Sequence, residues 1–456
     1  MTIRFDTVRD PFLSVYQSAV LAIAKQIDRQ SNTSARKAAP YQSAESVLSA
    51  IAADLVMREA GIPPAQGGDV SVSRDLTAAA SARYCAEFGL RYLKSLVAND
   101  PAATAQLQQE FTAGPCDPAW LTTITAYKKY LDGDGRRLPI PYIAPHKLKS
   151  NVIKINAGSR IAILADWGTG TLSAMDVLSN IRTCNPDVVV HLGDIYYSGT
   201  KEECDENFAN PVAKILRSGN KPVPVYALSG NHDMYSGGEG YYALISTLNP
   251  EPFRQHTSYF CLRTDDDNWQ FLAMDTGLHD DSPFSIADTE TYIEEEELEW
   301  LCARVSEFSG RTILLSHHQL FSAYSPIGTV RPDGSRSPIN SSLAKAYERI
   351  RSHGKIAAWF WGHEHTLSLY SPFAGLERGR CVGHGAIPVS VNDPIFEPVT
   401  GLTAVPRELQ YPKLKTDGRV YAHGFVTCLL GGETCRVDYH QVASGRGNVL
   451  YSEIIG

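Results

Sequence analysis

The sequence has no long apolar run and no closely spaced cysteines. No stretch of its 456 residues approaches the ~18 apolar residues of a membrane-spanning helix, so we expect no membrane partner. The nine cysteines are dispersed, and the closest two, Cys428 and Cys435, lie seven positions apart (435 − 428), which excludes C-x-x-C and zinc-finger spacings. An odd, dispersed set in a large chain is typical of reduced, buried thiols, and it predicts a cytoplasmic location.

An excess of positive charge is also absent. The formal net charge is −8, which argues against a nucleic acid as resident partner but is compatible with a small anionic substrate held by metal ions. The only candidate secretion signal ends near residue 24. Its uninterrupted apolar part, 19–24, is short, and Asp6 and Asp10 offset Arg4 and Arg9 in the preceding region, so we expect no signal peptide.

Two domains are expected from the length and from a change of pattern near residue 150. Apolar residues recur every three or four positions in the stretches 12–27, 47–56, 88–96 and 120–131, which predicts an all-α N-terminal domain with an accessory or oligomerisation role. The run Asp132-Gly133-Asp134-Gly135 lacks the later glutamate of a calcium loop, so it is interpreted as a turn that opens a proline-containing linker. The predicted domains are therefore 1–150, with the linker, and 151–456.

Strand and helix patterns alternate after residue 151, which predicts a layered α/β core completed by β-hairpins. The predicted strands are 160–165, 187–192, 223–228, 257–263, 269–275, 311–315, 356–361, 379–383, 422–430, 434–441 and 448–454. The predicted helices are 171–184, 201–217, 293–308 and 340–353.

Metal-binding residue types follow five of the apolar runs. These residues are Asp166, Asp194 with Tyr197, Asn231 with His232 and Asp233, His317, and His363 with His365. Loops at the carboxyl ends of strands in open α/β sheets gather side chains into one crevice, so we expect these residues to meet. Carboxylates, a phenol, an amide oxygen and imidazoles together suit iron, manganese or zinc, whereas calcium takes oxygen ligands alone.

These five blocks resemble the calcineurin-like metallophosphoesterases, over about residues 155–456. Gly168 stands where the general family has the histidine of an Asp-x-His motif, and Tyr197 lies three positions after Asp194. This combination resembles the purple acid phosphatase branch, including its tartrate-resistant type. The resemblance implies a four-layer αββα sandwich and a phosphatase with two metal ions, iron paired with iron, zinc or manganese.

The resemblance also implies a role for each site residue. One ion is expected on Asp166, Asp194, Tyr197 and His365, and the other on Asn231, His317, His363 and the bridging Asp194. A metal-bound hydroxide then attacks phosphorus in a small phosphorylated substrate. His232 is expected to contact the phosphate or to protonate the leaving oxygen, and Asp233 to hold the His232 ring.

Several alternatives stay open at this point. Tyr196 competes with Tyr197, although spacing favours Tyr197, and His318 competes with His317, which closes the strand. His384 is expected either to touch the substrate or to be packed in its loop. The further histidine of tartrate-resistant enzymes is absent from 321–326, which leaves open the leaving-group acid. A phosphodiesterase acting on nucleotides or lipids, or a hydrolase of another phosphorus-containing or activated bond, is the alternative function.

Overall fold

The structure, a computed structural model, covers most of the chain after residue 121. It describes residues 100–103, 106, 122–132, 134, 136–148, 151–218, 222–282, 289–325, 327, 331, 333–389, 391, 395–409, 412–418 and 420–456. The chain divides into two units, Met1–Leu121 and Thr122–Gly456. The helices predicted at 12–27, 47–56 and 88–96 lie outside the described residues, so the all-α domain and its proposed oligomerisation role stay predictions. The stretch 120–131 contains α5 (Thr122–Lys129).

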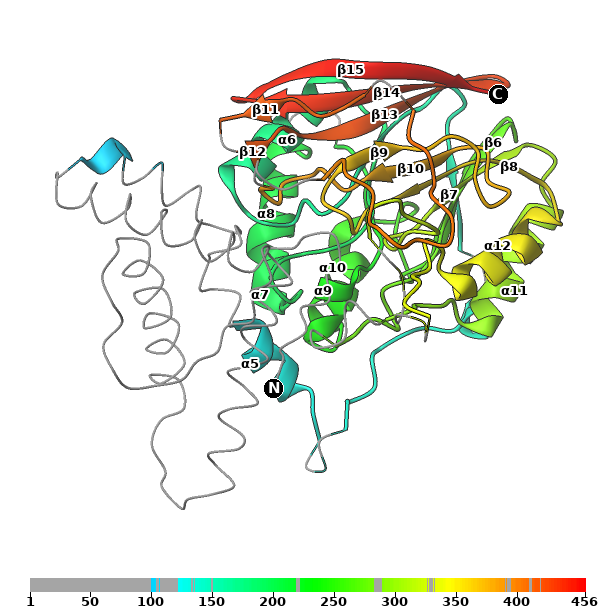
Figure 1. The fold of residues 1–456 in the computed structure, drawn as a ribbon, viewed down its shortest axis with the longest axis horizontal. Helices are drawn as coiled ribbons and strands as arrows, with labels where there is room; N and C mark the ends of the chain where they lie inside the picture. The colour runs from blue at the N-terminus through cyan, green and yellow to red at the C-terminus, as the bar shows by residue number, and fades with distance from the viewer. Residues whose placement is uncertain are drawn as a thin grey trace. The chain divides into compact units, whose positions relative to one another are not determined.

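Two large β-sheets form the centre of the second unit (Figure 1). One sheet has seven strands in the order β1-β5-β6-β7-β8-β10-β9, and the other has six in the order β15-β14-β13-β2-β3-β4. The strands are β1 (Val152–Ile155), β2 (Arg160–Leu164), β3 (Val188–His191), β4 (Val225–Ala227), β5 (Phe260–Thr264), β6 (Trp269–Ala273), β7 (Arg311–Leu315), β8 (Lys355–Trp361), β9 (Leu367–Leu369), β10 (Gly379–Val382), β13 (His423–Gly431), β14 (Thr434–Ala443) and β15 (Arg446–Ile455). The short strands β11 (Thr416–Asp417) and β12 (Val420–Tyr421) form a separate ribbon.

Helices cover the outer faces of both sheets, which gives four layers. The helices are α6 (Leu172–Thr183), α7 (Lys201–Glu203), the π-helix η3 (Cys204–Ala209), α8 (Asn210–Ile215), α9 (Asn231–Tyr235), α10 (Glu239–Leu248), α11 (Glu295–Ser306), α12 (Ser341–Arg351) and the 3-10 turn η2 (Pro145–Lys147). Apolar side chains of α6, α8 and α10 pack with the six-stranded sheet, and those of α11 and α12 pack with the seven-stranded sheet. The αββα architecture is therefore confirmed.

The alternation of side chains along β2 shows why the buried strands read as continuous apolar runs. Ile161 and Ile163 face the core between the sheets, whereas Ala162 and Leu164 face the helical layer that contains α6. A strand covered on both faces needs apolar residues at every position. The predicted strands after residue 156 all coincide with observed ones within a few residues, but α9, α10, β1 and β9 were not predicted.

Parallel pairing brings the predicted site residues to common edges. β2, β3 and β4 are parallel neighbours in one sheet, and β6, β7, β8 and β10 are parallel neighbours in the other. The carboxyl ends of parallel strands lie at the same edge of a sheet, and ligands bind there in open α/β folds. In the part of the chain that the structure describes, no helix is long and apolar enough to span a membrane.

Residues 122–148, the segment before β1, pack within the second unit. The carboxylate of Asp132 accepts hydrogen bonds from the backbone N–H groups of Asp134 (2.9 Å) and Arg136 (2.8 Å), which confirms a turn there. Further along the segment, the Tyr142 hydroxyl donates to Glu297 of α11 at 3.1 Å. Residues 122–148, which the sequence assigned to the N-terminal domain and linker, are thus part of this unit.

A buried ion pair joins the two sheets. Arg380 of β10 donates from Nε and Nη2 to the two carboxylate oxygens of Glu453 in β15, both at 2.8 Å. The Tyr439 hydroxyl of β14 donates to the same carboxylate at 2.6 Å. Burial opposes ionisation of Glu453, but the hydrogen bonds and charge of Arg380 outweigh it and lower the pKa of this carboxyl.

We expect Glu453→Gln to destabilise the protein by about 3 kcal/mol, because it leaves the Arg380 guanidinium buried without a counter-charge. Glu453 has a lowered pKa in the folded state, so its contribution is complete above the usual glutamate value of about 4.3 and is lost as the pH falls below it. Denaturant unfolding of both proteins across this range measures the difference. Glu433→Gln, at an exposed ion pair, is the control. An equal difference at all pH values would contradict the assignment.

Candidate metal centre

Two groups of donor atoms meet at the strand ends. Asp166 follows β2, Asp194 follows β3, Asn231 begins α9 after β4, His317 follows β7, and His363 and His365 follow β8. All of these side chains are at least nine-tenths buried. The structure therefore brings together six of the seven residues predicted as metal ligands.

The first group consists of Asp166, Asp194, Tyr196 and His365, and is called the Asp166 group. The Tyr196 hydroxyl lies 3.2 Å from Asp166 Oδ1, 3.0 Å from Asp194 Oδ2 and 3.0 Å from His365 Nε2. His365 Nε2 is 3.5 Å from Asp166 Oδ1. One hydroxyl proton cannot satisfy three such neighbours at once, whereas a cation among them can.

The second group consists of Asn231, His317 and His363, and is called the His317 group. Asn231 Oδ1 is 3.1 Å from His317 Nε2 and 3.1 Å from His363 Nδ1, and these two nitrogens are 3.2 Å apart. His317 Nδ1 lies 3.0 Å from the Leu192 carbonyl oxygen and must donate its proton there, so Nε2 presents a lone pair to the Asn231 oxygen. Donor atoms sharing one ion about 2.1 Å away lie about 3.0–3.4 Å apart, which fits this triangle.

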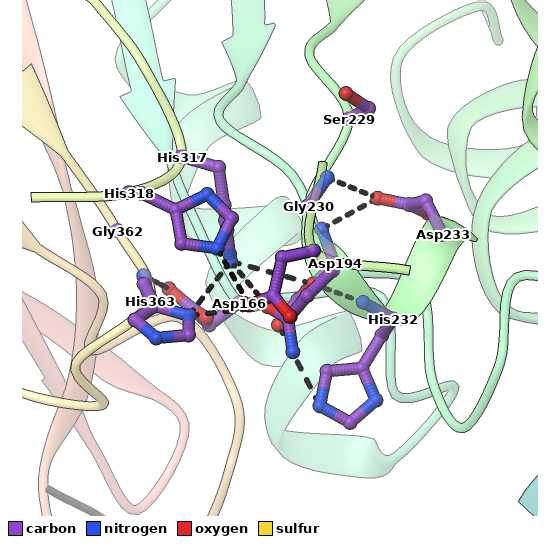
Figure 2. Close-up of polar contacts among 12 residues, drawn as sticks. Asp166, Asp194, Ser229, Gly230, His232, Asp233, His317, His318, Gly362 and His363 are labelled. Atoms are coloured by element: carbon purple, nitrogen blue, oxygen red, sulfur yellow. Dashed lines mark hydrogen bonds and ion pairs between the residues drawn. The ribbon is translucent and has the colours of Figure 1, made fainter. Parts of the chain in front are cut away.

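Asp194, a member of the Asp166 group, also faces the His317 group (Figure 2). Its Oδ2 accepts the hydrogen bond from Tyr196 in the Asp166 group, and its Oδ1 is 3.4 Å from His317 Nε2 in the His317 group. A carboxylate that presents one oxygen to each group can bridge two ions, as the sequence predicted. The donor set, two carboxylates, a phenol, an amide oxygen and three imidazoles, fits two cations.

Burial and neighbouring groups of like charge disfavour the charged forms of the site residues. Burial, reinforced by Asp166 and Asp233, raises the pKa of Asp194 well above its usual range, and burial with Asp194 and Asp166 does the same for Tyr196. Burial lowers the pKa of His317 and of His363 well below the usual value, and the neighbouring imidazoles add to this. Neutral imidazoles offer lone pairs, and bound cations reverse the cost of ionising buried carboxylates and phenols.

The backbone is strained at three of the donor residues. Asp166, Asp194 and His363 have φ angles of 53°, 75° and 65°, a region that residues other than glycine rarely adopt. The loops approach so closely that Gly193 cannot be replaced without conflict, because a Cβ there would lie 2.7 Å from Gly230 N and 2.8 Å from His317 Nδ1. Such strain costs about 1–3 kcal/mol per residue and is typical of functional sites.

Asp233 has a different role from the predicted one. Its carboxylate accepts hydrogen bonds from the backbone N–H groups of Asp194 (2.9 Å), Ile195 (3.1 Å) and Gly230 (2.7 Å), so it fixes the loops after β3 and β4 (Figure 2). The Tyr197 carbonyl oxygen, and not Asp233, lies at His232 Nδ1, at 2.8 Å. Asp233 therefore positions the loops rather than the His232 ring, because its oxygens face the backbone.

Tyr196 takes the place that the sequence gave to Tyr197. The side chain of Tyr196 is fully buried in the Asp166 group, whereas the backbone N–H of Tyr197 donates to Glu203 at 2.7 Å and its carbonyl faces His232. Asn207 also holds the Tyr196 carbonyl at 2.8 Å. Long-range contacts orient this loop, and only the adjacency of two tyrosines in the sequence signalled the alternative to Tyr197.

Two further histidines have defined surroundings. His318 lies beside the His317 group, with its ring centroid 4.5 Å from that of His363, and its nitrogens contact Thr276 Oγ1 and Asp280 Oδ2, each at 3.1 Å. The pairing with Asp280 was not predicted. His384 Nε2 lies 3.2 Å from the His440 carbonyl in β14, which favours the packed alternative for this residue.

The αββα sandwich thus carries a cluster of carboxylates and imidazoles at its strand ends. Residues 159–367 match the family model of calcineurin-like phosphoesterases. This match, over somewhat less than half of the chain, supports a place in the calcineurin-like superfamily of phosphoester hydrolases, and the described residues include two clusters that could each hold a metal ion.

The chain is also similar to parts of several solved structures. GAP50, the anchor in the inner membrane complex of Plasmodium, is 15% identical over 66% of this chain and 89% of that chain, with a TM-score of 0.44. A dimetal phosphatase from Danio rerio is 14% identical over 65% and 99% of the two chains, with a TM-score of 0.40. PhoD is 13% identical over 66% and 69%, with a TM-score of 0.43. No curated protein matches the chain.

We expect Asp194→Asn to weaken metal binding in both groups, because it removes the one charge that they share. Turnover of phosphate esters should fall by at least about 10²-fold. Metal analysis of the purified variant, together with its activity, checks both effects. Asp205→Asn, at an exposed residue of η3, is the control. An Asp194 variant with both ions and a tenth of the turnover would remove this residue from the centre of the site.

Proposed function

We propose that the protein hydrolyses phosphate monoesters of small molecules with two metal ions held by the Asp166 and His317 groups. The observation that carries this proposal is the placement of Asp194, whose two oxygens face the two groups at 3.0 Å and 3.4 Å. Bound ions in such a pair neutralise phosphate oxygens, orient the ester and lower the pKa of water. A small phosphorylated substrate, without nucleic acid or membrane as partner, agrees with the net charge of −8.

His232 is the residue that we propose to protonate the leaving oxygen. Its Nδ1 is 2.8 Å from the Tyr197 carbonyl oxygen, an acceptor that keeps a proton on Nδ1. Its Nε2 lies 3.9 Å from Asp194 Oδ2, on the side of the metal groups. A proton held at Nε2 is therefore the one that can move to the leaving group. The aromatic rings of Tyr196 and Tyr235, with centroids 4.6 Å and 4.8 Å away, fix the imidazole.

The donor set supports iron paired with iron, zinc or manganese as the two metals. Hard oxygen donors predominate in the Asp166 group, whereas two imidazoles and an amide oxygen make up most of the His317 group. Phenolate and carboxylate oxygens favour a trivalent ion, and imidazoles suit divalent iron, zinc or manganese. In this proposal Tyr196 compensates for the missing imidazole at Gly168, as the tyrosine of the purple acid phosphatase branch does.

We further propose a cytoplasmic location. Cys184, Cys204, Cys261, Cys302, Cys381, Cys428 and Cys435 are all free, and all but Cys184 are buried. Free cysteines in such number are typical of a reducing compartment.

A leaving-group series tests the reaction. With metals added, the purified protein should hydrolyse p-nitrophenyl phosphate and alkyl phosphates faster than bis-(p-nitrophenyl) phosphate. Faster cleavage of the diester would favour the alternative, a phosphodiesterase acting on nucleotides or lipids, and activity only on a broader panel would favour another phosphorus-containing or activated bond.

In the same series, His232→Ala should lower kcat for alkyl phosphates by about 10²–10⁴-fold, the usual loss for a general acid. The loss should shrink for nitrophenyl esters, whose leaving groups need no proton, and metal content should stay unchanged. His256→Ala, at an exposed histidine, is the control. Equal losses for all esters, or loss of metal, would reject His232 as the acid.

The iron-loaded protein tests the branch. If the Tyr196 phenol binds iron(III), aerobically loaded protein should show a visible charge-transfer band. Tyr196→Phe should abolish the band and weaken iron binding, while Tyr197→Phe, the matched neighbour, should leave both. A band that survives in Tyr196→Phe and disappears in Tyr197→Phe would restore the assignment based on spacing. No band in either variant or in the wild type would argue against an iron(III) phenolate.

A further inference from the structure

Arg137 connects the segment before β1 to two loops of the metal centre. Its Nη2 donates to the carbonyl oxygens of Met234 (2.7 Å) and Tyr235 (3.2 Å) at the end of α9. The same guanidinium contacts Asp281, with Nε 3.1 Å from the carboxylate Oδ2 and Nη2 3.1 Å from the carbonyl oxygen. Arg137 precedes residue 159, where the family match begins, so the family match does not include the residue that makes these contacts.

The guanidinium is itself held in place. It lies 4.3 Å above the ring of Tyr127 in α5, and Nη1 is 3.4 Å from the Tyr127 carbonyl oxygen. The backbone of Arg137 pairs with Leu131 across the turn, and its side chain is only 18% exposed. The bridge to Leu131 fixes the backbone of Arg137, and the Tyr127 ring fixes its guanidinium, so the guanidinium can orient the residues that it binds.

The first element that Arg137 contacts, α9, carries Asn231 and His232 of the metal centre. The last carbonyls of a helix lack partners within it, and Arg137 supplies donors to two of them. Tyr235 accepts a hydrogen bond from Asn231 Nδ2 at 2.5 Å, and this bond turns the Asn231 oxygen towards His317 and His363. Since the Tyr235 ring also packs on His232, anchoring Tyr235 orients both Asn231 and His232.

The second element that Arg137 contacts is the Asp280–Asp281 loop, which in turn contacts His318. Asp281 follows Asp280, whose Oδ2 lies 3.1 Å from His318 Nε2. His318 in turn is the neighbour of His317 and packs on the ring of His363. Arg137 therefore links the end of α9, which carries Asn231, to the loop that contacts His318.

We propose that Arg137 is a positioning residue of the active site, which holds α9 and the Asp280–Asp281 loop in register around the His317 group. The inference rests on the proposed function of that group. It extends the active unit upstream of the family-matched region, into a segment that the sequence presented as a linker. The chemistry suits arginine, because its planar guanidinium presents five donors in a fixed fork, whereas lysine presents a single ammonium.

The experiment compares full-length Arg137→Ala and Arg137→Lys with Arg136→Ala, a change at the exposed neighbouring arginine. Three quantities are measured: kcat and KM for a phosphomonoester, Mn²⁺ affinity by titration of the metal-free protein, and the thermal unfolding temperature. We expect both Arg137 variants to lose about 10–100-fold in kcat or in Mn²⁺ affinity, as is usual when a residue that supports metal ligands is removed. Arg136→Ala should match the wild type.

Rescue by guanidinium ions, at concentrations far below those that denature proteins, distinguishes a positioning role of Arg137 from a role in stability alone. They should restore part of the kcat or Mn²⁺ affinity of Arg137→Ala and should not improve the wild type or Arg136→Ala. Folded Arg137 variants with wild-type kcat and Mn²⁺ affinity would overturn the proposal, as would losses that follow only the unfolded fraction without rescue. If the wild type hydrolyses no phosphate ester, the proposed function fails, while the Mn²⁺ titrations still test Arg137.

Discussion

The buried carboxylate of Asp194 is the point on which the site depends. It is almost fully excluded from water, lies near Asp166 and Asp233, and receives hydrogen bonds from the Tyr196 hydroxyl and the His232 backbone. Burying several acidic groups together is unfavourable unless cations or hydrogen bonds compensate them. The rest of the site is arranged to meet this constraint: neutral imidazoles supply lone pairs, and Asp233 is satisfied by three backbone N–H groups.

The stability of the sandwich offsets the unfavourable free energy of that arrangement. Strands of both sheets end at the site, so that ligands distant in sequence come from rigid neighbouring elements and not from one flexible loop. The extensive apolar core between the sheets stabilises the fold, and the Arg380–Glu453 pair joins the two sheets. This stability can hold Asp166, Asp194 and His363 in left-handed backbone conformations that an isolated loop would not maintain.

The sequence could predict the features that arise from local pattern. Apolar runs revealed the strands, and a carboxylate, amide or imidazole after five of them marked six candidate ligands that the structure places together. Local pattern could not choose between Tyr196 and Tyr197, because that choice depends on Glu203 and Asn207, which clamp the backbone from the next helical segment. It also could not show that Asp233 faces backbone amides, since this requires the loops after β3 and β4 to be adjacent.

The segment 321–326, which contains no histidine, is buried in its described part. Phe321 packs against Trp361 and Tyr370, and its neighbours through Ser325 are buried, so the described part of this segment belongs to the core under the seven-stranded sheet. An acid for the leaving group must then come from elsewhere. His318 has both nitrogens engaged by Thr276 and Asp280, whereas His232 has Nδ1 on a carbonyl and Nε2 towards Asp194. Of these two imidazoles, His232 is therefore the better placed to deliver a proton, which is the requirement that monoesters with poor leaving groups impose.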